Sequence, residues 1–119
     1  MEQISTIHRV VIQLSSNDVM IQKATISQLN NILNAFNQIQ IELVMNGSGI
    51  ELVLQEAAMA NIVELLYHKG IQFLVCQNTL NQKNLDHKSL LSFCKIIPSA
   101  MAHLIVRQSE GWSYIKAGF

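Results

Sequence analysis

Charge is scarce in this sequence, and neither sign dominates. Only 13% of the 119 residues are charged, and eight Lys and Arg residues balance eight Asp and Glu residues. A chain without excess positive charge lacks the long-range attraction on which non-specific binding to nucleic acid depends. We therefore expect no nucleic acid among its partners. A weakly charged surface also offers little resistance to association between copies, which favours an oligomer.

Long apolar runs are absent as well. No stretch approaches the roughly 20 apolar residues of a membrane-spanning helix, and residues 1–6 have neither the basic start nor the apolar centre of a secretory signal. We expect a cytoplasmic protein without a membrane partner, whose two cysteines are reduced. Half of the residues are apolar, so the chain can form one domain, residues 1–119, without a disulfide.

Short apolar runs recur along the chain. The runs at 10–14, 39–45, 71–76, 95–97 and 112–116 are rich in β-branched or aromatic residues, which predicts five strands. The run at 39–45 alternates most cleanly between apolar and polar residues. We expect that strand to lie nearer an edge of the sheet, or to have a wetter face.

Helical spacing of apolar residues fills the intervals between these strands. It predicts helices at about 19–36, within 50–69 with a break near 56–60, around 79–82 and between Pro98 and Gly111. Alternating strands and helices are typical of a parallel sheet between helices. The expected fold is therefore α/β, a three-layer α/β/α sandwich with a mainly parallel five-stranded sheet, similar to Rossmann and flavodoxin-like folds.

One cysteine occupies a position that suggests chemistry. Cys76 ends the strand at 71–76, and Asn78 and Thr79, which can begin a helix, follow at once. Ligands of open α/β sheets bind at the carboxyl ends of the strands, and a nearby helix amino terminus favours a thiolate over a thiol. Cys76 is thus a candidate reactive thiol. The alternative is a small apolar residue that is buried and inert.

The segment Gly47, Ser48 and Gly49 follows another predicted strand. Glycines before a helix let backbone N–H groups approach an anion, so these residues are candidates for anion binding together with Asn78 and Thr79. Leu52 stands where a dinucleotide-binding fingerprint needs its third glycine. A tight turn between strand and helix is the simpler interpretation of the same residues.

Other residues that often carry chemistry form no such pattern. The four histidines have no metal-type spacing with one another or with the cysteines, so we expect no metal and no organic cofactor. Cys94 is more typical of a packed cysteine than of a resolving thiol, although the sequence does not show its distance from Cys76. Trp112 and Tyr114 favour a core or subunit contact over ligand stacking, and of the two we expect a subunit interface.

Four blocks of the sequence resemble the DsrE/DsrF-like family of small sulfur-metabolism proteins, in its stand-alone branch. They are the first strand with Ser15 and Asp18 after it, residues 46–50 (NGSGI), residues 76–80 (CQNTL) and residues 108–116 (QSEGWSYIK). The resemblance implies a three-layer domain that assembles into homotrimers or hexamers. It also implies that a cysteine after the third strand, here Cys76, carries sulfur as a persulfide between partner proteins.

Two functions follow as expectations. The first is a persulfide carrier or sulfurtransferase-like relay through Cys76, with sulfur donor and acceptor proteins as partners. The second is a non-catalytic homo-oligomeric module that binds a small anionic ligand or a protein at the cleft beside the strand ends. The sequence does not decide whether the protein is an enzyme.

Overall fold

The five predicted strands form one sheet in a computed structural model, which describes residues 7–118. The strand order is β4-β3-β2-β1-β5, and every neighbouring pair is parallel. The predicted fold class is confirmed. The strands are β1 (His8–Leu14), β2 (Ile39–Met45), β3 (Gln72–Cys76), β4 (Lys95–Ile97) and β5 (Ser113–Lys116).

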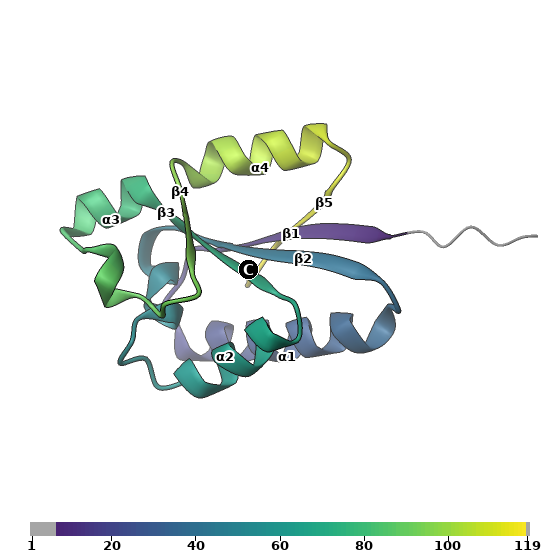
Figure 1. The fold of residues 1–119 in the computed structure, drawn as a ribbon, viewed down its shortest axis with the longest axis horizontal. Helices are drawn as coiled ribbons and strands as arrows, with labels where there is room; N and C mark the ends of the chain where they lie inside the picture. Colours follow the sequence, from purple (N-terminus) through teal and green to yellow (C-terminus); the bar gives the residue numbers. More distant parts are fainter. Residues whose placement is uncertain (1–6, 119) are drawn as a thin grey trace, which may run out of the picture.

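Helices cover both faces of the sheet and complete the three layers. The helices α1 and α2 lie on one face, whereas α4 lies alone on the other and carries the chain from β4 at one edge to β5 at the opposite edge (Figure 1). The α-helices are α1 (Val19–Ala35), α2 (Ala60–His68), α3 (Gln77–Lys83) and α4 (Ala100–Ser109), and the 3-10 helices are η1 (Gly47–Val53) and η2 (His87–Ser89).

Local sequence signals begin and end these helices. Asp18 precedes α1, and its carboxylate accepts hydrogen bonds from the N–H groups of Met20 and Ile21 at 2.8 and 3.2 Å. Gly70 follows α2 with a φ of +105°, the left-handed conformation that the sequence predicts there. The break expected within residues 50–69 is present, because η1 ends at Val53 and α2 begins at Ala60.

The two faces of the sheet are packed to different extents. A large apolar core lies between the sheet and α1, α2 and η1. On the other face the buried apolar cluster is small, so α4 is held there by few hydrophobic contacts. Its buried members are Val11, Val44, Leu74, Cys76, Ala100 and Leu104.

The expected edge position of the strand at 39–45 is wrong, because β2 pairs with both β1 and β3. The wetter face is present instead. Glu42 projects on the α4 side of β2 and is buried, with 7% of its surface exposed. The alternating pattern thus arises from a sparsely covered face and a buried carboxylate within the sheet.

The helix after β3 begins earlier than predicted, at Gln77 and not near Thr79.

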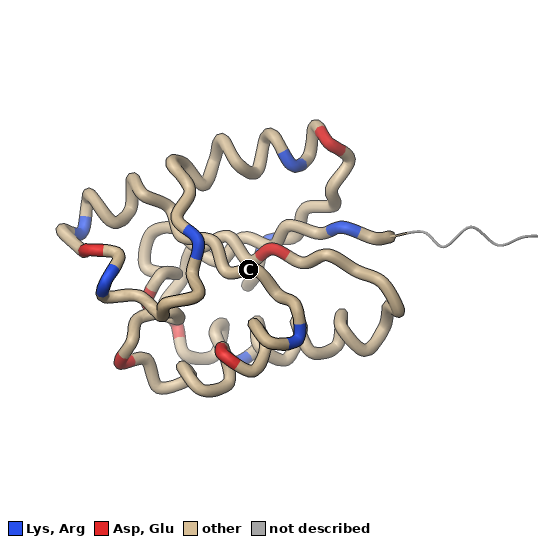
Figure 2. Tube along the Cα trace, in the orientation of Figure 1, with Lys and Arg blue, Asp and Glu red and all other residues tan. Residues whose placement is uncertain are grey.

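Charged residues of both signs are interspersed over the fold (Figure 2). Across residues 7–118, no helix has the length and apolar character needed to cross a membrane.

Candidate functional site

Cys76 is the last residue of β3 and the residue that precedes α3. It projects on the α4 side of the sheet, within the small apolar cluster. Only 5% of its surface is exposed, so the thiol lies just beneath the surface and not in an open cleft. The predicted position at the carboxyl end of a strand is therefore correct, and burial is the feature that the sequence did not show.

Hydrogen-bond donors from two helices surround the sulfur atom of Cys76. The N–H group of Ala100, the first residue of α4, donates to Sγ at 3.4 Å. The N–H groups of Asn78 and Thr79, in the first turn of α3, and the Thr79 hydroxyl also favour the anion. The side chain makes no cap hydrogen bond of regular geometry to α3, so Ala100 is the closely placed donor.

These donors decide the direction of the shift in pKa. Burial alone raises the pKa of the Cys76 thiol, since a buried anion loses its hydration. The hydrogen bond from Ala100, together with the nearby donors of Thr79 and Asn78, outweighs this effect and lowers the pKa below its ordinary value. The site therefore stabilises a thiolate, which is the nucleophilic form of cysteine.

Thr79 connects the thiol to the predicted glycine segment. The Thr79 side chain is buried, and its hydroxyl oxygen accepts a hydrogen bond from the N–H group of Gly47 at 3.0 Å. That N–H group is already bonded, and the N–H group of Gly49 donates to the Asn46 carbonyl at 3.0 Å. Asn78 is exposed at the surface beside them. Anion binding by these residues stays a prediction.

The glycine segment also has a structural role at the end of β1. A side chain at Gly49 would place its Cβ 2.1 Å from the carbonyl oxygen of Leu14, so only glycine fits. The Ser48 hydroxyl donates to the carbonyl of Ser15 at 3.3 Å. These contacts bring η1 against the carboxyl end of β1 and support the simpler interpretation of a tight turn.

Cys94 and Cys76 lie on opposite faces of the sheet. Cys94 packs against the large core on the α1 and α2 side, whereas Cys76 belongs to the cluster on the α4 side. Burial raises the pKa of Cys94 to about 12. A thiol on the opposite face of the sheet cannot resolve a disulfide with Cys76 without large movement.

A second polar cluster on the α4 face was not predicted. Glu42 accepts from Arg107 through both carboxylate oxygens, at 2.9 and 2.7 Å, and lies 2.7 Å from Nε2 of His103. Arg107 also donates to Glu110 at 2.9 Å, and its guanidinium lies 4.5 Å from the centre of the Trp112 ring. The sequence signals that could have indicated this cluster were a glutamate within a predicted strand and a His and an Arg four residues apart on one predicted helix.

Trp112 and Tyr114 make different contacts. Trp112 packs partly buried against the cluster on the α4 side, under Arg107. Tyr114 is 38% exposed, and its hydroxyl donates to the buried side chain of Gln13. Trp112 thus makes a core contact, which was the alternative to the expected subunit interface, and the subunit interface stays a prediction.

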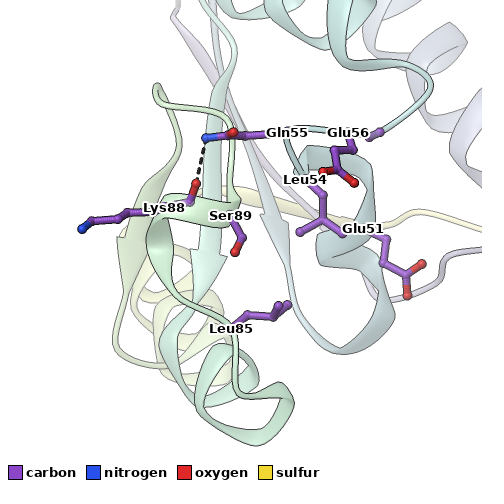
Figure 3. Close-up of a pocket in the computed structure, with 8 residues that line it drawn as sticks. Glu51, Leu54, Gln55, Glu56, Leu85, Lys88 and Ser89 are labelled. Carbon is purple, nitrogen blue, oxygen red and sulfur yellow. Dashed lines mark hydrogen bonds between the residues drawn. The ribbon is translucent and has the colours of Figure 1, made fainter.

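A cavity of about 550 Å³ lies between the segment after η1 and the segment that includes η2 (Figure 3). Gln55 spans it and donates to the Lys88 carbonyl at 2.7 Å, while the Lys88 amine points away. Glu51 and Glu56 also line it, but Cys76 does not. Within residues 7–118, His, Cys, Asp and Glu residues form no group of three that could hold a metal ion.

Fold and site together define the class: a small three-layer α/β domain whose parallel sheet presents one acidic thiol between two helix amino termini. A model of the DsrE/DsrF-like family matches residues 8–117. The chain belongs to the DsrE/DsrF-like family. Membership of this family suggests a role in sulfur metabolism.

Solved structures show the same fold. The protein of unknown function MTH1491 from Methanobacterium thermoautotrophicum is 28% identical with a TM-score of 0.90, over 92% of this chain and 98% of that chain. BT1422 from Bacteroides thetaiotaomicron, also described as of unknown function, is 12% identical with a TM-score of 0.66, over 91% and 93% of the two chains. A search of curated proteins gave no match.

Proposed function

We propose that this chain is a cytoplasmic sulfur-handling protein that carries a persulfide on Cys76. The observation that carries the proposal is the placement of Sγ against the Ala100 N–H group and the first turn of α3, which lowers the thiol pKa despite burial. Family membership is consistent with the proposal, since it suggests a role in sulfur metabolism.

The proposed transfer needs no external oxidant. The Cys76 thiolate attacks the outer sulfur of a donor persulfide, a new S–S bond forms on Cys76, and the donor leaves as a thiolate. An acceptor thiolate then attacks the outer sulfur of the Cys76 persulfide, and Cys76 leaves as the thiolate. In the first step a lowered pKa increases the fraction of Cys76 present as the attacking thiolate. In the second step it speeds the departure of Cys76, since a thiolate leaves faster when its thiol pKa is low.

Each donor has a distinct part in this chemistry. The Ala100 N–H group contacts Sγ directly and stabilises negative charge on it before attack and after departure. The Thr79 oxygen is held by the Gly47 N–H group, which fixes the hydroxyl beside the thiol. We expect a Thr79→Val variant to keep the fold and to load sulfur more slowly.

The burial of Cys76 limits the size of the sulfur donors that can reach its thiol. With 5% of Cys76 exposed, a sulfur atom reaches Sγ through a narrow opening or after a local shift of α3 or α4. A slim persulfide at the end of a protein side chain or of a small thiol suits this access better than a bulky group. Donor and acceptor proteins are therefore proposed as partners.

Persulfide loading followed by peptide mass spectrometry tests the proposal. The protein is incubated with glutathione persulfide, and we expect the mass of one added sulfur atom on the peptide that contains Cys76. The Cys76→Ser variant should lose this addition. The Cys94→Ser variant is the matched control and should load as the unchanged protein does. Equal loading of Cys76→Ser would remove the proposal.

Burial of Cys76 favours a second candidate, a non-catalytic homo-oligomeric module. Such a module would bind a small anion or a protein at the carboxyl ends of the strands, and the thiol would serve packing. Absence of loading, together with a trimeric or hexameric mass by light scattering, would support this candidate. The homo-oligomer itself stays a proposal under both functions.

A further inference from the structure

The apolar contacts of α4 do not determine its position well. Of its ten residues, only Ala100 and Leu104 are buried in the cluster that faces the sheet. Met101, Ile105 and Val106 are exposed on its outer side. A helix with two small areas of apolar contact can slide along a sheet at low cost unless polar contacts fix it.

Glu42 supplies such contacts from the centre of the sheet. His103 and Arg107, on successive turns of α4, both bind its carboxylate, and Arg107 uses two nitrogen atoms. A paired carboxylate with two parallel N–H···O bonds restricts position and orientation strongly. The residues beside Glu42 on the neighbouring strands, Val11 and Gln72, are uncharged, so α4 provides the partner charges.

The start of the same helix contacts the thiol. Ala100 lies one turn before His103, and its N–H group donates to Sγ of Cys76 at 3.4 Å. An α-helix rises about 1.5 Å per residue, so a shift of α4 by one residue would break that contact. A rigid helix thus links the carboxylate of β2 to the sulfur at the end of β3.

We propose that Glu42 is a positioning residue for Cys76, holding α4 through His103 and Arg107 in the register at which the Ala100 N–H group meets Sγ. The inference rests on the proposed function, in which Sγ reacts as a thiolate. Glu42 itself does not touch the sulfur. It lies opposite Gln72, four residues before Cys76 on the neighbouring strand.

The test measures alkylation of Cys76 by iodoacetamide at pH values from 5 to 9, resolved by peptide mass spectrometry in the full chain. For Glu42→Gln we expect the midpoint of the profile to rise and the rate at pH 6 to fall about tenfold, the effect of one lost hydrogen bond to the anion. Arg107→Lys, which keeps the charge but loses the paired geometry, should produce a smaller change of the same sign.

Two control variants distinguish a loss of the position of α4 from a general loss of stability. Glu110→Gln removes the exposed partner of Arg107 and leaves both Glu42 contacts, so the profile should not change. Val63→Ala weakens the core on the opposite face without touching α4. A shift in Val63→Ala equal to that in Glu42→Gln would overturn the inference.

The outcomes also distinguish this inference from the proposed function. An unchanged profile in Glu42→Gln, with a low midpoint in the unchanged protein, overturns the positioning role and leaves the carrier function standing. An ordinary thiol profile in the unchanged protein overturns both. A raised midpoint in Glu42→Gln with both controls unaffected supports both.

Discussion

The two cysteines show how strongly a site depends on the atoms around one residue. Cys76 and Cys94 are both largely hidden from solvent, yet the pKa of Cys76 is lowered and that of Cys94 is raised to about 12. The difference comes from backbone N–H groups, which reach the sulfur of Cys76. Burial without such donors leaves a cysteine neutral and inert at physiological pH.

The sequence predicted part of the surroundings of Cys76. The end of an apolar run followed by helix-starting residues identified the thiol and the first turn of α3. The Ala100 donor lies 24 residues away in sequence and reaches Sγ only because α4 crosses the sheet. Contacts of this kind depend on tertiary structure, which short-range patterns do not encode.

At Gly49 we expect substitution by alanine to lower the free energy of unfolding by about 3 kcal/mol. The added Cβ would lie 2.1 Å from the Leu14 carbonyl oxygen, and backbone must move to relieve this clash. Urea denaturation measures the loss. Gly70→Ala is the control, since no atom lies within 4 Å of the added Cβ there and any loss reflects only its φ of +105°. A loss at Gly49 no greater than at Gly70 would contradict the expectation.

At the scale of elements, α4 has an unusual distribution of side chains. Its ionisable residues His103 and Arg107 face the sheet, while Met101 and Ile105 face solvent. The sequence identified this helix from its apolar periodicity and could not show which face was covered. The buried carboxylate of Glu42 explains the orientation, because it attracts the charged face inward.

The carboxylate also makes the attachment of α4 depend on pH. Burial raises the pKa of Glu42, but hydrogen bonds and charges of Arg107 and His103 outweigh burial and lower it below its ordinary value of 4.5. A lowered pKa in the folded state means stability that is present above pH 4.5 and is lost as pH falls through the folded value.

We therefore expect Glu42→Gln to cost about 2 to 4 kcal/mol at pH 7 and much less near pH 3. Urea unfolding of both proteins at several pH values measures the difference. The exposed Glu56 provides a comparison, because Glu56→Gln should change stability little at any pH. A cost for Glu42→Gln that stays constant down to pH 3 would argue against the ion pairs as its source.

At the scale of the whole molecule, most of the architecture follows from sequence. Strand and helix alternation predicted the parallel sheet and its two covered faces, and each predicted strand is present. The strand order was not predicted, which is why β2 was expected near an edge. Order depends on which crossovers pack together, and the 39–45 pattern reflects a buried glutamate that local reasoning cannot distinguish from an exposed one.

The even distribution of charge leads to a prediction for the whole molecule. Because eight basic residues balance eight acidic ones and both signs are interspersed along the described part of the chain (Figure 2), we expect no retention on a cation-exchange or heparin column at pH 7. The chromatography needs only the unmodified protein. Retention that declines steeply with salt would contradict it and would reopen nucleic acid as a partner.

The strands at the two rims of the sheet are its shortest, three residues in β4 and four in β5. Strands this brief give an incoming chain few backbone groups with which to pair. The domain can therefore expose apolar side chains on α4 with little tendency to form fibrils through the edges of its sheet. We therefore expect partners of this domain to contact its side chains and not to extend its sheet through backbone hydrogen bonds.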